Sequence, residues 1–240
     1  MNKSTKKGLV ASGSIWKRNQ VTRRRVIQRV CQCLTVAHGC PRLGNPRDPL
    51  DDLVYIIISN KTTASTAQRV YRDLKARFPC WRDMIGNGRA LRSILRPAGL
   101  STVKSAQLVR AVTQIDHDIG TCDLRSLRNL PPERAEKYLC SLSGVSTKVA
   151  RCIMMYTMNA RVLPVDSHVH RVASRLGWTA RKRADQCHQE LEALVPPSRR
   201  FAFHVDCIVL GRTVCRPRHP RCTQCCISGY CPSSRAKHGS

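Results

Sequence analysis

The stretch that decides the fold runs from Leu139 to Val172, and it reads LCSLSGVSTKVARCIMMYTMNARVLPVDSHVHRV. Residues 133–140 can form a short helix, because the two prolines before them suit a first helical turn. Gly144 interrupts this pattern, and from Thr147 to Met158 apolar residues recur at helical spacing. The sequence therefore predicts a helix-hairpin-helix unit over residues 133–158.

The hairpin at residues 143–146 should leave backbone amides unpaired at the start of the second helix. Such a helix N-terminus attracts anions, and phosphate is the obvious one. Lys148 lies in the first turn of that helix, where the helix dipole disfavours a cation, so we expect a lowered pKa for this lysine. A neutral amine is what a nucleophile requires, which makes Lys148 a candidate nucleophile. The alternative is a surface lysine that contacts phosphate.

Asp166 follows Lys148 by eighteen residues, directly after Pro164 and Val165. Its position indicates the start of another helix, over residues 166–176, where an aspartate caps well. Asp166 is therefore a candidate catalytic carboxylate, a plain helix cap, or both.

A lysine and an aspartate on two helix starts beside a phosphate-binding hairpin resemble the endonuclease III family of helix-hairpin-helix DNA glycosylases. The family motif Leu-Pro-Gly-Val-Gly-x-Lys-x-Ala is matched at Leu142, Gly144, Val145, Lys148 and Ala150. The family's Val-Asp-Thr-His is matched by Val165, Asp166, Ser167 and His168. Ser143 replaces the motif's proline, and Ser146 replaces its second glycine, which usually permits a positive φ or a close approach to phosphate.

The resemblance implies an all-α fold, with a helical-barrel domain and an iron–sulfur cluster domain. It places the central helical domain at residues 49–161 and a cluster-bearing domain, formed by both chain ends, at 26–48 and 162–240. Residues 1–25 are basic and lack acidic residues, so we expect a disordered arm; the alternative is an organelle transit peptide.

Apolar periodicity predicts further helices at residues 26–38, 65–78, 87–95, 105–116, 184–194 and 201–215. The apolar run at residues 51–59 fits a buried strand as well as a buried helix, and the resemblance favours the helix.

The charge of the chain is an argument about its partners. There are 42 Lys and Arg residues against 15 Asp and Glu residues, a net charge of +27, so nucleic acid is the leading partner and an anionic membrane surface the alternative. No apolar run is long enough to span a membrane. Aromatic residues are few, at 5%, which favours a duplex binder over a single-strand binder built on stacking. We expect a monomer in the bacterial cytoplasm, associated with the nucleoid, with organelle targeting as the alternative.

Four cysteines near the C-terminus have the spacing C-x6-C-x2-C-x5-C, at Cys215, Cys222, Cys225 and Cys231. Four thiolates in a short segment bind zinc or an iron–sulfur cluster, and spacing alone does not choose between them. The resemblance implies a [4Fe–4S] cluster. Arg216, Arg218 and Arg221 lie between the first two ligands, as a candidate phosphate clamp or a solvated charge run.

The resemblance also implies a base-excision DNA glycosylase with AP lyase (β-elimination) activity, acting on damaged bases or abasic sites in double-stranded DNA. Oxidised pyrimidines such as thymine glycol would be removed through a Schiff base on Lys148, assisted by Asp166. The predicted DNA contacts are Lys61, Leu100, Gly144, Val145, Ser146, His168, Arg216, Arg218 and Arg221. Leu100 corresponds to a wedge inserted into the duplex, or is an ordinary helix-cap hydrophobe.

Other classes of protein remain open. A glycosylase of the same superfamily could act on mismatched thymine or 8-oxoguanine instead. A helix-hairpin-helix module can bind DNA without catalysis. A zinc-dependent RNA-binding protein is the third alternative.

Overall fold

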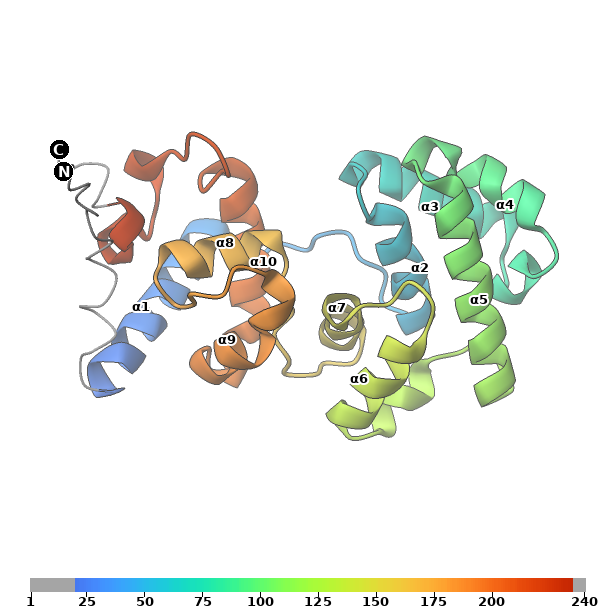
Figure 1. Cartoon of the computed structure of the whole chain (residues 1–240), viewed down its shortest axis with the longest axis horizontal. Helices are drawn as coiled ribbons and strands as arrows, with labels where there is room; N and C mark the ends of the chain where they lie inside the picture. Colours follow the sequence, from blue (N-terminus) through green and yellow to red (C-terminus); the bar gives the residue numbers. More distant parts are fainter. Residues whose placement is uncertain (1–19, 235–240) are drawn as a thin grey trace, which may run out of the picture. The chain divides into compact units, whose positions relative to one another are not determined.

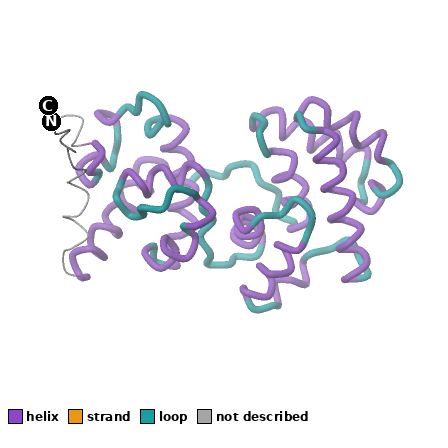
Figure 2. Tube along the Cα trace, in the orientation of Figure 1, coloured by secondary structure: helices purple, strands orange, loops and turns teal. Residues whose placement is uncertain are grey.

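The computed structural model describes residues 20–234, which divide into two compact units (Figure 1). Within the described residues, the first unit comprises both chain ends, 20–41 and 165–234, and the second comprises Arg42–Pro164. Every regular element between residues 20 and 234 is helical, with no strand (Figure 2). The all-α prediction is therefore confirmed.

The second unit contains the helices α2 (Pro49–Ser59), α3 (Ala64–Arg77), α4 (Gly88–Leu95), α5 (Ser101–Ile119), α6 (Pro132–Ser141) and α7 (Thr147–Thr157). The first unit contains α1 (Gln20–His38), α8 (Ser167–Arg175), α9 (His188–Leu194) and α10 (Arg200–Thr213). Short 3-10 turns join them, at Trp81–Met84, Arg96–Ala98, Arg125–Asn129, Ala184–Gln186, Pro197–Arg199, Cys222–Gln224 and Ser228–Tyr230.

Helix α2 is the centre of the second unit. It packs against α3, α5 and α7, and its apolar run from Leu53 to Ile58 is buried. Pro49 occupies the first turn, and the Asp48 carboxylate caps the helix by accepting from the Leu50 and Asp51 amides at 3.0 and 3.2 Å. The ambiguous apolar run is thus a buried helix, as the resemblance implied.

The first unit is built around α10, which packs against α1 and α8. Trp178 stacks on Phe203, with ring centroids 5.4 Å apart. Asp206 is buried and accepts hydrogen bonds from Thr35 Oγ1 and the Cys40 amide at 3.2 and 3.0 Å. Because a buried carboxylate is costly unless bonded, these contacts fix the end of α1 on α10.

Several helix boundaries differ from the predicted ones. Helix α1 begins at Gln20, so residues 20–25 of the predicted arm are helical, since no proline or glycine stops the helix there; residues 1–19 of that arm lie outside the described residues. The predicted helix at 184–194 is a 3-10 turn followed by α9, because the Cys187 amide bonds to the Ala184 carbonyl and closes a short turn. Helix α5 extends beyond its predicted bounds at both ends.

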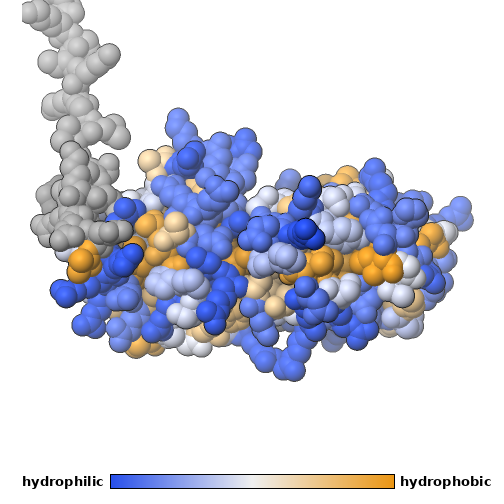
Figure 3. All heavy atoms as spheres, turned by 90° about the horizontal axis from the view of Figure 1, so that it is seen from below, coloured by the Kyte–Doolittle hydropathy of each residue, from blue (hydrophilic) through white to orange (hydrophobic). Residues whose placement is uncertain are grey.

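The face of the surface seen in Figure 3 is largely hydrophilic, with apolar residues scattered among charged ones. None of the helices between residues 20 and 234 is long and apolar enough to cross a bilayer.

Candidate functional site

The hairpin between α6 and α7 turns at Gly144. Its φ is +84°, and a Cβ placed there would lie 2.9 Å from the Gln107 side chain of α5. A side chain at this position would be both strained and crowded. Val145, next in the chain, is buried, and its amide bonds to the Leu142 carbonyl at 3.1 Å. The backbone of the hairpin is therefore fixed by the packing of the second unit.

Ser146 stands where the family motif has glycine, and its conformation suits a serine. Its φ is −87° and its ψ 167°, which is extended backbone that any residue adopts. The Ser146 Oγ accepts from the Val149 amide at 3.4 Å, so the serine caps α7. Gly144 and Ser146 are both exposed, and the start of α7 consequently opens to solvent.

Lys148 is the second residue of α7 and is half-buried. Its helix is held against α6 by an ion pair between Arg151 Nε and Glu136 Oε1 at 3.0 Å, and it packs against α2 on another side. Asp52 of α2 is fully buried, and the Lys148 charge acts on its carboxyl group. The lowered pKa expected for Lys148 stays a prediction.

Lys61 and Leu100 share an uncommon backbone conformation. Lys61 lies in the turn after α2 with φ +56°, and Leu100 caps α5 with φ +52°; both are exposed. A left-handed conformation costs a residue with a side chain about 1 kcal/mol or more, and such strain is concentrated at functional sites. Both predicted DNA contacts therefore lie in strained, accessible segments of the second unit.

Lys104 joins these two segments, and the sequence analysis did not single it out. This lysine is 2% exposed, and its Nζ donates to the Ile58 carbonyl at the end of α2 and to the Ala98 carbonyl, both at 2.8 Å. Burial lowers the Lys104 pKa. The buried ammonium thus fixes the ends of the segments that carry Lys61 and Leu100.

Asp166 is the N-cap of α8 in the first unit. Its Oδ1 accepts from the His168 and Val169 amides at 2.9 and 2.8 Å, which bears out the cap interpretation. In the described part of the chain, no residue donates a hydrogen bond to Oδ2. One oxygen of the carboxylate therefore builds the helix, and the other can take part in chemistry. Lys148 and Asp166 belong to different units.

His168 is half-buried between α8 and α10. Arg171 Nη2 donates to His168 Nδ1 at 3.0 Å, and it also donates to the Gly211 carbonyl at 2.9 Å. Burial lowers the His168 pKa, while Asp166 opposes this shift.

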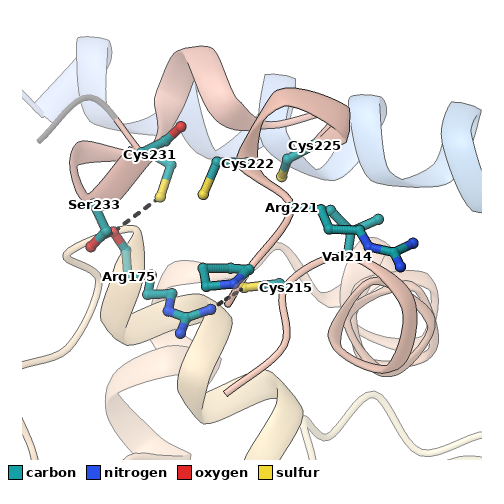
Figure 4. Close-up of a pocket in the computed structure, with 10 residues that line it drawn as sticks. Arg175, Val214, Cys215, Arg221, Cys222, Cys225, Cys231 and Ser233 are labelled. Atoms are coloured by element: carbon teal, nitrogen blue, oxygen red, sulfur yellow. Dashed lines mark hydrogen bonds between the residues drawn. The ribbon is translucent and has the colours of Figure 1, made fainter. Parts of the chain in front are cut away.

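The four C-terminal cysteines line one cavity of the first unit, with a volume of about 240 Å³. Figure 4 shows their sulfur atoms around a common space. Cys215 follows α10, Cys222 begins one 3-10 turn, and Cys225 and Cys231 each follow such a turn. The structure therefore brings the predicted ligand set together, and Cys226 is not among the residues that line the cavity.

Two arginines of α8 hold this cysteine loop. Arg175 Nη1 donates to Cys215 Sγ at 3.1 Å (Figure 4), and it also donates to the Arg216 carbonyl at 2.9 Å. Arg171 Nε donates to the Cys215 carbonyl at 2.8 Å. Neither arginine was predicted from the sequence, although their four-residue spacing, which puts them on one face of α8, was a signal for a shared contact.

The cavity offers four thiols to a metal centre. Between residues 20 and 234, no three His, Cys, Asp or Glu side chains stand close enough together to hold one metal ion. A zinc ion would need its four sulfur ligands at about 2.3 Å from one point. Burial raises the pKa of Cys225 and of Cys231, so a bound cationic group would be required to keep these thiols ionised. The four thiols around the cavity therefore fit a bound metal centre, and this donor set suits an iron–sulfur cluster as well as zinc.

Arg216, Arg218 and Arg221 are exposed on the loop between Cys215 and Cys222. The Arg216 carbonyl is bound by Arg175, which orders the backbone of the loop while the side chain of Arg216 reaches solvent. Three accessible cations on an ordered loop form a positive surface suited to phosphate.

Comparisons with known proteins agree with this architecture. The family model described as "HhH-GPD superfamily base excision DNA repair protein" matches residues 54–197. An Arabidopsis thaliana protein whose name assigns it provisionally to the DNA glycosylases is 32% identical over 67% of this chain, which spans only 55% of that relative. An endonuclease III homolog of Encephalitozoon cuniculi is 28% identical, covering 76% of this chain and 78% of its own. A solved non-covalent complex of endonuclease III with DNA superposes with a TM-score of 0.79 at 19% identity, covering 90% of this chain and 99% of that one.

Proposed function

Because the chain belongs to the HhH-GPD superfamily of base excision DNA repair proteins, we propose that it is a DNA glycosylase with AP lyase activity on duplex DNA. The observation that carries this proposal is Lys148 in the first turn of α7, behind the exposed Gly144 turn and the Ser146 cap. A helix N-terminus that opens to solvent can bind the phosphate of a damaged strand and place the amine beside its sugar.

The reaction begins when the damaged nucleotide leaves the base stack. The neutral Lys148 amine forms a bond to C1′ while the glycosidic bond breaks, and the departing base takes that electron pair and a proton. Opening of the sugar ring gives an imine between Nζ and C1′. The imine makes a C2′ proton acidic; when that proton is lost, its electron pair forms a double bond and the 3′ phosphate leaves.

Asp166 serves this reaction through charge. Its Oδ1 is occupied by two amides of α8, so Oδ2 is the oxygen that faces the developing positive charge of the sugar. The same oxygen can accept a proton from the attacking amine. Because the cap on α8 fixes the Asp166 carboxylate in one orientation, it contributes to the mechanism.

The DNA is held by two kinds of contact. The hairpin around Gly144, Val145 and Ser146, together with exposed cations, binds the phosphate backbone, while the Val145 amide stays bonded to the Leu142 carbonyl. The exposed cations are Lys61, Arg216, Arg218 and Arg221. Leu100 is 52% exposed and enters the duplex as a wedge that keeps the vacated space open. His168 lies in the first turn of α8, in the first unit, and supports the start of that helix.

Cys215, Cys222, Cys225 and Cys231 hold a [4Fe–4S] cluster in this proposal. A bound cluster would give each of these cysteines a metal bond and would so fasten a short, cationic segment in which few apolar side chains are buried. Arg175 donates to the Cys215 sulfur and stabilises its negative charge. The cluster loop then presents its three arginines in a fixed arrangement.

The test compares Lys148→Ala with Lys137→Ala, an exposed lysine of α6 in the same unit. Thymine glycol and abasic duplexes are the substrates, with borohydride trapping of the imine and melting temperature as the folding control. Lys148→Ala should lose base excision and trapping, whereas Lys137→Ala should keep both. Asp166→Asn retains a capping side chain and should slow base release by about 10²–10³.

Near wild-type excision by Lys148→Ala would overturn the assignment of the nucleophile. Absence of trapping by the wild-type protein would indicate a binding module without lyase chemistry. Duplexes with 8-oxoguanine or mismatched thymine are tested in the same assay. If either is cleaved faster than the thymine glycol duplex, that lesion is the substrate in place of oxidised pyrimidines.

A further inference from the structure

Asp52 is a buried carboxyl group in the middle of the second unit that the proposed reaction leaves unused. It lies in the first turn of α2 and is fully buried. Asn45 Nδ2 donates to its Oδ1 at 2.6 Å. Its Oδ2 is buried as well and has no hydrogen-bond partner among residues 20–234. Because a buried polar atom without a partner costs about 1–3 kcal/mol, this oxygen calls for an explanation.

Lys148 of α7 is the candidate partner for the Asp52 carboxylate. Helix α2 packs against α7, whose first turn carries Lys148. Burial raises the Asp52 pKa to about 7, the Asn45 hydrogen bond opposes this rise, and so does the positive charge of Lys148. The Lys148 charge therefore acts on Asp52 across the α2–α7 interface.

We propose that Asp52 is a positioning residue for Lys148, which holds the lysine ammonium when ionised and takes up one of its protons to release the amine. In this step an Nζ–H bond of Lys148 breaks and an Oδ2–H bond of Asp52 forms. The lysine changes from +1 to neutral and the carboxylate from −1 to neutral, so the pair keeps its proton and its net charge. The inference rests on the proposed function of Lys148.

The pair has a distinctive dependence on pH. Below about pH 7 both groups are protonated, and the amine is scarce. Above about pH 7 the two groups together hold one titrating proton, which lies either on Lys148 or on Asp52. The fraction of molecules with this proton on Asp52, and hence with a neutral amine, does not change with pH. The rate of imine formation should therefore rise up to about pH 7 and then level off. Without Asp52, the amine fraction would keep rising by about tenfold per pH unit up to the pKa of the lysine.

The other charged groups around Asp52 do not account for such a profile. Asp51 is bound by Lys75 Nζ at 2.9 Å and by the Trp81 indole at 2.7 Å. Asp48 is occupied with the amides of α2. Tyr71 of α3 titrates above its usual range because burial and Asp51 raise its pKa. Lys104 of α5 is bound to two carbonyl groups.

The experiment measures the trapping rate on a preformed abasic duplex from pH 5.5 to 9. Asp52→Asn is nearly isosteric, and Asp51→Asn is the matched control on the same turn with the same change in charge. Asp52→Asn should remove the plateau, so that its rate keeps rising above about pH 7 where the wild-type rate has levelled off. Asp51→Asn should keep the plateau. Duplex affinity and melting temperature are measured for each protein.

A second variant covers the case in which Asp52→Asn does not fold. Asn45→Ala removes the hydrogen bond that holds the Asp52 pKa down, so it should move the inflection to higher pH. An unmoved inflection, or a plateau in folded Asp52→Asn, would overturn the role of Asp52 and leave the lyase function intact. If the wild-type protein forms no imine at any pH, the proposed function fails and this inference falls with it.

Discussion

Replacing Lys104 by methionine should show how much the buried ammonium of α5 contributes to the second unit. The methionine keeps most of the apolar stem and removes the charge and two hydrogen bonds, to the Ile58 and Ala98 carbonyls. Hydrogen bonds from a charged group contribute about 1.5–3 kcal/mol each, so their loss costs about 3–6 kcal/mol. Relief of the burial of the ammonium, a cost of several kcal/mol, offsets about half of that. We expect the free energy of unfolding to fall by about 1.5–3 kcal/mol.

The substitution should also act on DNA binding. Leu100 holds a left-handed conformation that costs about 1 kcal/mol, and the bond from Lys104 to Ala98 fixes the segment just before it. If binding requires that conformation, the affinity for an abasic duplex should weaken by about fivefold, which corresponds to about 1 kcal/mol.

Urea unfolding followed by circular dichroism measures the stability. Lys137→Met is the control variant, because it also replaces a lysine by methionine. Lys137 is exposed on α6, so its replacement should change the free energy of unfolding by at most about 0.5 kcal/mol. Equal stability of the two variants would refute the argument, because the Lys104 bonds would then contribute nothing beyond the cost of burying the charge.

Two further predictions concern the cluster and the DNA. Cys226→Ser should leave iron and sulfide content unchanged, because Cys226 does not line the cavity, whereas Cys225→Ser should lose both; one zinc per chain and no iron in the purified protein would contradict the cluster. The logarithm of the duplex affinity should fall linearly with the logarithm of salt concentration with a slope of about −4 to −6, as four to seven phosphate contacts require. A slope near zero would exclude binding dominated by phosphate.

Local chemistry made much of the fold predictable. Asp48, Ser146 and Asp166 each cap a helix, and in each case the signal lies within three residues of the cap. Gly144 was recognisable because only glycine suits its turn. The cysteines were recognisable from their spacing. Such features need no knowledge of distant parts of the chain.

For α5, apolar periodicity predicted the buried face only in part. Apolar periodicity over residues 105–116 indicates Ala106, Val109, Val112 and Thr113 as the inward residues; Val112 is buried, but the buried residues also include Lys104, Leu108, Ala111 and Ile115. These four lie at helical spacing, so the pattern was present, but a lysine in the first position argued against it. The expectation that a lysine is exposed outweighed its helical spacing, because a charged side chain is seldom buried unless it is paired.

Asp52 and Lys104 have in common that their partners are distant in sequence. Lys104 binds a carbonyl 46 residues away, and Asp52 is influenced by a lysine nearly a hundred residues further along the chain. No periodicity or motif encodes such a pairing. Asp52, whose Oδ2 is buried without a partner, costs folding energy that an apolar side chain would not, so stability alone does not account for it. Asp52 adjoins the helix start that carries Lys148, and Lys104 fixes the segments of Lys61 and Leu100. Both polar residues lie inside the core where the predicted chemistry is positioned, and this coincidence is the reason to read them as functional.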